Sequence, residues 1–193
     1  MRKELFNPDF SKRGYIQVYT GNGKGKTTAS LGLALRALGR GWDVLMVMLT
    51  KGGNDYGELN SFKNLIKEID NKLTIVNAGL DKVLFKKNIT DEDKTEIQRG
   101  WEIAKCGIQS GEYSLVIIDE ANIAIDLDLI DVDDVVDTLK NKPDNVEVVL
   151  TGRRAHKKII EIAHLVSEIK PIKHYWDIGV EAREGVEFWK KNI

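Results

Sequence analysis

The chain has 193 residues, with 29 Lys plus Arg against 30 Asp plus Glu, so its formal net charge at neutral pH is −1. Hydrophobic residues make up 42% and charged residues 31%, a balance typical of a globular protein. This near-neutral composition gives no reason to expect nucleic acid or an anionic membrane as a partner. Any anion-binding site must therefore be local.

Cys106 is the single cysteine, which excludes an intramolecular disulfide, and no Cys/His cluster has zinc-ligand spacing. Residues 1–14 lack the apolar core of a signal peptide, and no stretch approaches the 18 uninterrupted apolar residues of a membrane span. At roughly 150 residues per domain, one domain is favoured over two. We therefore expect one cytoplasmic domain over residues 1–193, with residues 1–14 as an N-terminal extension.

Short β-branched runs alternate with longer amphipathic stretches, a pattern that predicts an α/β fold with a mostly parallel sheet covered on both faces. In chain order the predicted elements are strand 15–19, helix 28–38, strand 43–49, helix 60–69, strand 73–76, helix 91–108, strand 115–119, helix 131–140, strand 146–151, helix 155–164 and strand 166–169. In the longest helix, Ile97, Trp101 and Ile108 share an apolar face, and Thr90 with Asp93 forms a predicted capping box at its start.

A glycine-rich segment, TGNGKGKTT from Thr20 to Thr28, joins the first strand to the first helix. Its glycines allow a tight turn that aims backbone N–H groups at phosphate oxygens beside the positive end of a helix. Lys26 adds a mobile charge, and the Thr27 hydroxyl suits Mg²⁺. The usual pattern begins with glycine where this chain has Thr20, which predicts a tighter loop. The alternative is an ordinary strand-to-helix turn, but the flanking elements favour phosphate binding.

A second motif, LVIIDE, is an apolar strand that ends in Asp119 and Glu120 and resembles a Walker B strand. The carboxyl ends of parallel strands line the ligand crevice, so an acid here can reach a metal at the phosphate loop. The alternative is that Asp119 caps a turn and Glu120 is solvated.

A third motif, TGRR, follows the strand 146–151 and carries Arg153 and Arg154. A guanidinium at a strand end can bind phosphate oxygens through two parallel hydrogen bonds, although paired arginines are more often a solvated surface. The sequence thus predicts a local concentration of positive charge at Lys24, Lys26, Arg153 and Arg154.

Together these motifs resemble the P-loop ATP:corrinoid adenosyltransferases (cob(I)alamin adenosyltransferases). The resemblance covers residues 14–188 and includes TGNGKGKTTA, Lys51-Gly52, Gly57-Glu58, IIDEANIAI, VVLTGRRAH and VSEIKPIKHYWDIGVEAREGVEF. It implies a three-layer P-loop NTPase-like (RecA-like) domain in which the C-terminal segment 171–193 packs on the active-site side.

The resemblance also implies a reaction. Members transfer the 5′-deoxyadenosyl group of ATP to the Co(I) centre of a reduced corrinoid and release triphosphate. Because cobalt is the nucleophile, no side-chain nucleophile or general base is needed, and the protein positions the substrates. ATP, Mg²⁺ and a corrinoid are the expected ligands, and a flavoprotein reductant and a homodimer are the expected partners.

The matching motifs also imply which residues form the site. The resemblance implies a catalytic set of Lys26, Thr27, Glu120 and Arg153. It implies an ATP-binding set of Gly21, Asn22, Gly23, Lys24, Gly25, Lys26, Thr27, Thr28 and Arg153. It implies a Mg²⁺-binding set of Thr27, Glu120 and Asp119.

The corrinoid side departs from the family pattern. Members carry a Phe-x-Trp pair that displaces the lower ligand of cobalt, whereas this chain has AGLDKVLF over 78–85, which keeps an apolar Leu80 and lacks the tryptophan. Leu84 or Phe85 is a substitute from a shifted register, with core packing as the alternative. Trp176 is a further candidate, again with core packing as the alternative.

Two other classes of function remain open from the sequence. One is a P-loop ATPase or kinase that uses the same loop and produces ADP. The other is a non-catalytic corrinoid or nucleotide carrier, which the missing tryptophan would permit.

Overall fold

A computed structural model describes residues 14–50, 61, 62, 64, 72–80, 84–183, 185 and 186 of the chain. Its centre is a six-stranded sheet in the order β3-β2-β4-β5-β1-β6, and every pairing in it is parallel. The prediction of a parallel α/β sheet is therefore confirmed. The strands are β1 (Ile16–Thr20), β2 (Val44–Met48), β3 (Leu73–Asn77), β4 (Leu115–Asp119), β5 (Glu147–Thr151) and β6 (Leu165–Glu168).

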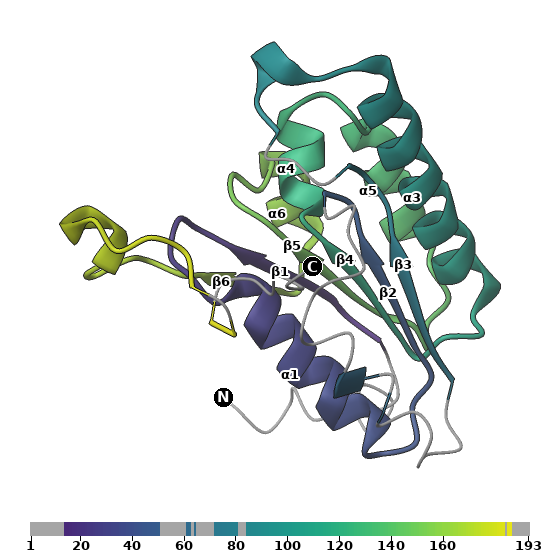
Figure 1. Cartoon of the computed structure of the whole chain (residues 1–193). Coiled ribbons are helices and arrows are strands. Elements are labelled where there is room, and N and C mark those ends of the chain that lie inside the picture. Colours follow the sequence, from purple (N-terminus) through teal and green to yellow (C-terminus); the bar gives the residue numbers. More distant parts are fainter. Residues whose placement is uncertain are drawn as a thin grey trace, which may run out of the picture.

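Helices lie on both faces of this sheet, with α1 on one face and α3 to α6 on the other (Figure 1). None of the described helices is both long enough and apolar enough to cross a bilayer. Of the predicted helix 60–69, only residues 61, 62 and 64 are described. The helices are α1 (Lys26–Leu38), α3 (Asp91–Ser110), α4 (Ala121–Asp126), α5 (Val132–Lys140) and α6 (Lys157–Ile162), with 3₁₀ turns η3 (Lys86–Asn88) and η4 (Tyr175–Ile178).

Strand β2 shows why the fold has three layers. Its side chains alternate between the two faces of the sheet, as the pleat requires. Met46 and Met48 pack in the core on the α1 side, whereas Leu45 and Val47 pack in the core on the α3 side. Both faces are therefore buried, which explains why the sequence of this strand is apolar throughout.

Helix α3 begins at the predicted capping box. The Asp93 N–H donates to Thr90 Oγ1 at 3.3 Å, and the Thr90 N–H donates back to the Asp93 carboxylate at 2.7 Å. Farther along α3, Trp101 Nε1 donates to Asp134 of α5 at 2.7 Å. Lys105 of α3 forms an ion pair with the same carboxylate, so one acid joins two turns of α3 to α5.

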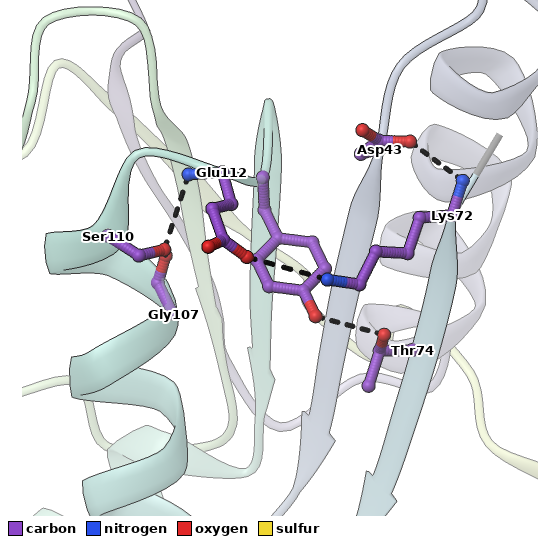
Figure 2. A network of polar contacts seen from close by, with 7 residues as sticks. Asp43, Lys72, Thr74, Gly107, Ser110 and Glu112 are labelled. Atoms are coloured by element: carbon purple, nitrogen blue, oxygen red, sulfur yellow. Dashed lines mark hydrogen bonds and ion pairs between the residues drawn. The ribbon is translucent and has the colours of Figure 1, made fainter.

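A polar network closes the amino ends of β2 and β3, the edge opposite the phosphate loop (Figure 2). The Lys72 N–H donates to Asp43 Oδ1 at 2.7 Å, and Lys72 Nζ lies 3.5 Å from Glu112 Oε2. Beside them, Thr74 Oγ1 and the Tyr113 hydroxyl are 3.0 Å apart. The polar groups at this edge bind one another, so these contacts connect the amino ends of the strands to the end of α3.

Several elements differ from the prediction: β1 begins and ends one residue after the predicted 15–19, and α1 begins two residues before the predicted 28–38. Helix α6 is shorter than the predicted 155–164, and β6 begins and ends one residue before the predicted 166–169. Helix α4 was not predicted. It has only six residues and begins directly after Glu120, whose backbone is left-handed with φ 61°, so neither a cap nor a long apolar stripe signals it.

Candidate active site

The order of the strands brings the three predicted motifs together. Strand β5 lies between β4 and β1, and all three run in parallel. The loop after β1, the acids at the end of β4 and the TGRR turn after β5 therefore leave the sheet side by side at its carboxyl edge. This is the edge at which ligands bind in open α/β sheets.

The glycine-rich loop packs against the chain that leaves β6. The Gly23 N–H donates to the Ile169 carbonyl at 2.7 Å, and the Ile169 N–H donates to the Thr20 carbonyl at 2.8 Å. A Cβ on Gly23 would lie 2.8 Å from the Ile169 oxygen, and one on Gly21 would lie closer still. These two glycines thus serve the contact with Ile169. Gly25 differs, because its φ of 121° requires glycine and its missing side chain faces no atom of the described residues within 4 Å.

The N-terminus of α1 has the features of an anion site. Gly25 is its N-cap and provides no side-chain cap, and the first turn has no acidic residue. Helix α3, in contrast, has a threonine cap and three acids in its first turn. The free N–H groups and the positive helix end of α1 are therefore left for another acceptor, as in phosphate-binding loops.

Lys26 is the cation at this helix end. Its side chain is only 7% exposed, and its Nζ donates to the Gly23 carbonyl at 2.8 Å, so the ammonium folds back over the loop. Burial lowers the pKa of Lys26, the charges of Glu120 and then Asp119 oppose this effect, and Arg153 adds to it. An arriving polyanion would favour the charged ammonium and could replace the Gly23 carbonyl as its acceptor.

A chain of hydroxyl and carboxylate groups links the loop to β4 and β5. Thr27 Oγ1 donates to Asp119 Oδ2 at 3.3 Å, and Thr151 Oγ1 donates to Asp119 Oδ1 at 2.6 Å. Asp119 is thus buried with a hydroxyl donor on each oxygen. The alternative in which Asp119 only caps a turn does not describe this arrangement.

Glu120 lies next to this chain and is half-buried. It is the N-cap residue of α4, but its side chain makes no capping bond. A Cβ on Gly152 would lie 3.1 Å from Glu120 Oε2, so the carboxylate extends over the TGRR turn. Glu120 therefore presents a carboxylate whose charge acts on Lys26.

The structure separates the four predicted cations into two pairs. Arg153 is exposed and has no hydrogen bond or ion pair within the described part of the chain, and its charge reaches Lys26. Arg154 instead pairs with Asp126 at 2.8 Å, and Lys24 Nζ donates to the Tyr175 hydroxyl at 3.0 Å and to the Val186 carbonyl at 2.9 Å. The side chains of Lys24 and Arg154 therefore contact protein groups, whereas Arg153 is the predicted cation whose charge acts on Lys26.

The remaining residues of the predicted ATP site, Asn22 and Thr28, are exposed on the loop and on the first turn of α1. The corrinoid candidates are scattered. Leu80 is half-buried after β3, Phe85 is 55% exposed before η3, and Trp176 is 67% exposed in η4. In Figure 1 the teal segment that contains η3 lies at the top of the view, and the yellow-green segment that contains η4 lies well apart from it at the left.

Leu84 and several segments of the predicted motifs remain to be placed. Leu84 is partly buried and packs against the core on the α3 side, in keeping with the packing alternative. Asp81, Lys82 and Val83 lie outside the described residues, as do the Lys51-Gly52 and Gly57-Glu58 segments.

Sequence reasoning did not assign a role to Thr151, Ile169 or Tyr175. Thr151 was visible as a polar residue at a strand end, which is a usable signal. The contacts of Ile169 and Tyr175 with the loop join positions nearly 150 residues apart, and no local pattern encodes them.

The chain matches the sequence model of one family, ATP:corrinoid adenosyltransferase BtuR/CobO/CobP, over residues 12–188. The chain belongs to this family. Among relatives, a corrinoid adenosyltransferase of Escherichia coli (strain K12) is 34% identical over 177 residues, which are 92% of this chain and 87% of that protein. A corrinoid adenosyltransferase of a Sinorhizobium species is 35% identical over 188 residues, which are 97% of this chain and 86% of that protein.

A further relative is the uncharacterized protein all2391 of a Nostoc species (strain PCC 7120). It is 41% identical over 180 residues, which are 90% of this chain. The chain spans about half of that longer protein, 48% of its length.

Proposed function

We propose that this corrinoid adenosyltransferase family member transfers the 5′-deoxyadenosyl group of ATP to the Co(I) centre of a reduced corrinoid. An electron pair on cobalt forms the bond to the 5′ carbon, the bond from that carbon to the triphosphate oxygen breaks, and triphosphate leaves with the bonding electrons. The family match and the names of its relatives support this reaction. No proton transfer by a side chain is required.

The observation that carries the proposal is the buried ammonium of Lys26, held over an uncapped helix N-terminus with Arg153 nearby. Negative charge grows on the departing triphosphate, and fixed cations stabilise it most strongly where water is excluded. We assign the triphosphate to the backbone N–H groups from Gly21 to Gly25, with contacts from Lys26, Thr28 and Arg153. The family's reversed nucleotide directs the 5′ carbon, and not the γ-phosphate, toward the acceptor.

Thr27, Asp119 and Glu120 fit Mg²⁺ by the chemistry of their oxygens. Within the described residues no group of three or more His, Cys, Asp or Glu is placed to hold a metal alone, so phosphate and water oxygens would complete the shell, as is usual for Mg²⁺. Thr27 donates its proton to Asp119, which leaves its oxygen lone pairs available to a cation. When bound, Mg²⁺ supplies positive charge to the triphosphate.

For the corrinoid we propose contacts from Leu80, Phe85 and Trp176. The exposure of Phe85 and Trp176 supports a role outside the core, since large apolar side chains are usually buried. A flavoprotein reductant, a homodimer and a cytoplasmic location are further proposals that rest on the family resemblance and on the single cysteine. We treat residues 1–193 as one domain, with 171–193 on the active-site side.

One incubation separates this function from its alternatives. The chain is mixed with ATP, Mg²⁺ and chemically reduced cobalamin, and the phosphorus products are identified by ³¹P NMR. Adenosyl transfer gives triphosphate, whereas an ATPase or kinase gives ADP. A carrier binds both ligands and gives neither product, so either of these outcomes would overturn the proposal.

A further inference from the structure

We propose that Thr151 is a positioning residue that sets the two acids at the end of β4, and through them the cation-binding oxygens beside the phosphate loop. The inference rests on the proposed function for its setting. It adds a residue that the family motif alone does not assign to the site. The role is structural control of other side chains, because Thr151 itself reaches no substrate position.

The Thr151 hydroxyl makes one hydrogen bond to Asp119 and one to Glu120. The side chain is 0% exposed, and its single proton goes to Asp119 Oδ1 at 2.6 Å. Its oxygen accepts the Glu120 N–H at 2.9 Å. A threonine hydroxyl has one proton to donate, so these two bonds together fix its orientation.

The parallel register of β4 and β5 explains why this residue can reach both acids. Ile118 pairs with Leu150, so the next position along each strand places Asp119 beside Thr151. Both strands end there, and both side chains are buried. The hydrogen bond between Thr151 and Asp119 therefore links the ends of β5 and β4 at the carboxyl edge of the sheet, next to the glycine-rich loop.

The position of Glu120 depends on Thr151 because the backbone conformation of Glu120 is unfavourable without support from its surroundings. With φ 61° and ψ 22° it is left-handed, a conformation that residues with a Cβ adopt only when their surroundings impose it. The bond from the Glu120 N–H to Thr151 helps to impose it. Gly152, the next residue, leaves space for the Glu120 carboxylate.

Thr27 depends on Thr151 through Asp119. Thr151 holds one carboxylate oxygen, which turns the other toward the Thr27 hydroxyl. Without the Thr151 hydroxyl, Asp119 Oδ1 would lose its 2.6 Å donor in a buried position and the carboxylate could rotate. The Thr27 hydroxyl would then lose its fixed direction, and the Glu120 backbone would lose its acceptor.

The test measures ATP binding by the full chain, with and without Mg²⁺, by isothermal titration calorimetry. For Thr151→Val, which keeps the shape and removes the hydroxyl, we expect the Mg²⁺ concentration for half-maximal stimulation of ATP binding to rise by about tenfold or more, the usual effect of losing a partner of a metal-binding residue. The ATP affinity of Thr151→Val in EDTA should stay within about twofold of the wild-type value. Thr151→Ser, which keeps the hydroxyl, should need the same Mg²⁺ concentration as the wild type.

Thr138→Val is the matched control, because Thr138 is also a buried threonine but lies on α5. It should leave the Mg²⁺ requirement unchanged, whatever its effect on thermal stability. If Thr151→Val does not fold, Thr151→Cys replaces it under the same criterion, since a thiol is only a weak donor. An unchanged Mg²⁺ requirement in the folded variant overturns the proposal, as does ATP binding by the wild-type chain that is independent of Mg²⁺. Failure of adenosyl transfer with a shifted Mg²⁺ requirement would instead reject the proposed function alone.

Discussion

Lys24 Nζ lies 3.0 Å from the Tyr175 hydroxyl and donates a hydrogen bond to it, across 151 positions of sequence. The same ammonium donates to the Val186 carbonyl, and the Arg183 guanidinium lies 4.8 Å from the centre of the Tyr175 ring. Lys24 belongs to the glycine-rich loop, so these contacts tie the loop to the described part of the C-terminal segment. The Lys24 side chain therefore contacts protein groups of the C-terminal segment.

Removing the Tyr175 hydroxyl should loosen the C-terminal segment. In Tyr175→Phe we expect faster amide hydrogen exchange over residues 171–183, with a loss of at most about 1 kcal/mol in unfolding free energy because the bond is exposed. Tyr113→Phe is the control, since Tyr113 lies at the opposite edge of the sheet beside Thr74. Equal exchange over 171–183 in the Tyr175 variant and the wild type would contradict this role.

Adding one methyl group at Gly152 should disturb the acids. Gly152→Ala places a Cβ at φ 121° and 3.1 Å from Glu120 Oε2, which should cost about 1–3 kcal/mol of stability and weaken Mg²⁺-dependent ATP binding. Gly32→Ala is the control, because Gly32 is inside α1 with no described atom near the added Cβ, and it should gain about 0.5–1 kcal/mol. Chemical denaturation and ATP titration measure both effects. ATP binding that survives Gly152→Ala unchanged would remove Glu120 from the site.

The two neighbouring arginines should behave differently. Arg153→Ala removes a cation that has no ion pair among the described residues and acts on Lys26, and it should weaken ATP binding by about 10- to 100-fold, the value of a charge-assisted hydrogen bond. Arg154→Ala removes an exposed pair with Asp126 and should change ATP affinity little. Equal losses in the two variants, measured by calorimetry, would argue against the assignment of Arg153.

Asp134 should make the stability of the fold depend on acid pH. Hydrogen bonds from Lys105 and then Trp101 hold the pKa of Asp134 below its ordinary value of 3.8. The folded state therefore favours the ionised acid, so this contribution is complete above that ordinary value and is lost as pH falls through the lowered one.

Asp134→Asn should consequently lower the Tm at pH 7, and the deficit should shrink near pH 3. Asp137→Asn on the exposed side of the same helix provides the comparison and should alter the Tm little at either pH. Thermal melts followed by circular dichroism measure both variants. A deficit in Asp134→Asn that is the same at both pH values would show that its ion pair is not responsible.

The parts of the fold that sequence predicts are those with strong periodicity or strong caps. The buried strands 115–119 and 146–151 and the capped helix at Thr90 are found within one residue at their starts. Strands β1 and β6 are each displaced by one residue from their predicted ranges, although β1 is largely buried and β6 is exposed along its whole length, so burial alone does not decide the accuracy of a strand's bounds. Helix α4 depends on the left-handed turn at Glu120, which tertiary contacts with Thr151 help to hold.

In the candidate site, too, some features could be predicted from the sequence and others depend on contacts made only in the folded chain. Strand ends and the glycine loop were enough to place Lys26, Asp119 and Arg153 at one edge, because parallel strands share an edge. The protein contacts of Lys24 with Tyr175 and of Arg154 with Asp126 were not predictable, since these partners approach them only in the folded chain. A count of charges along the sequence does not show which of them are paired within the protein.

In the proposed reaction the 5′ carbon of ATP becomes bonded to cobalt. The direct measurement uses the wild-type chain, Mg²⁺, chemically reduced cobalamin and ATP labelled with ¹³C at the 5′ position, followed by ¹³C NMR of the corrinoid product. We expect the label to appear in a carbon bonded to cobalt, with one triphosphate released per corrinoid, and we expect Lys26→Ala to abolish both. Label that remains in ATP or ADP while phosphate is released would contradict it.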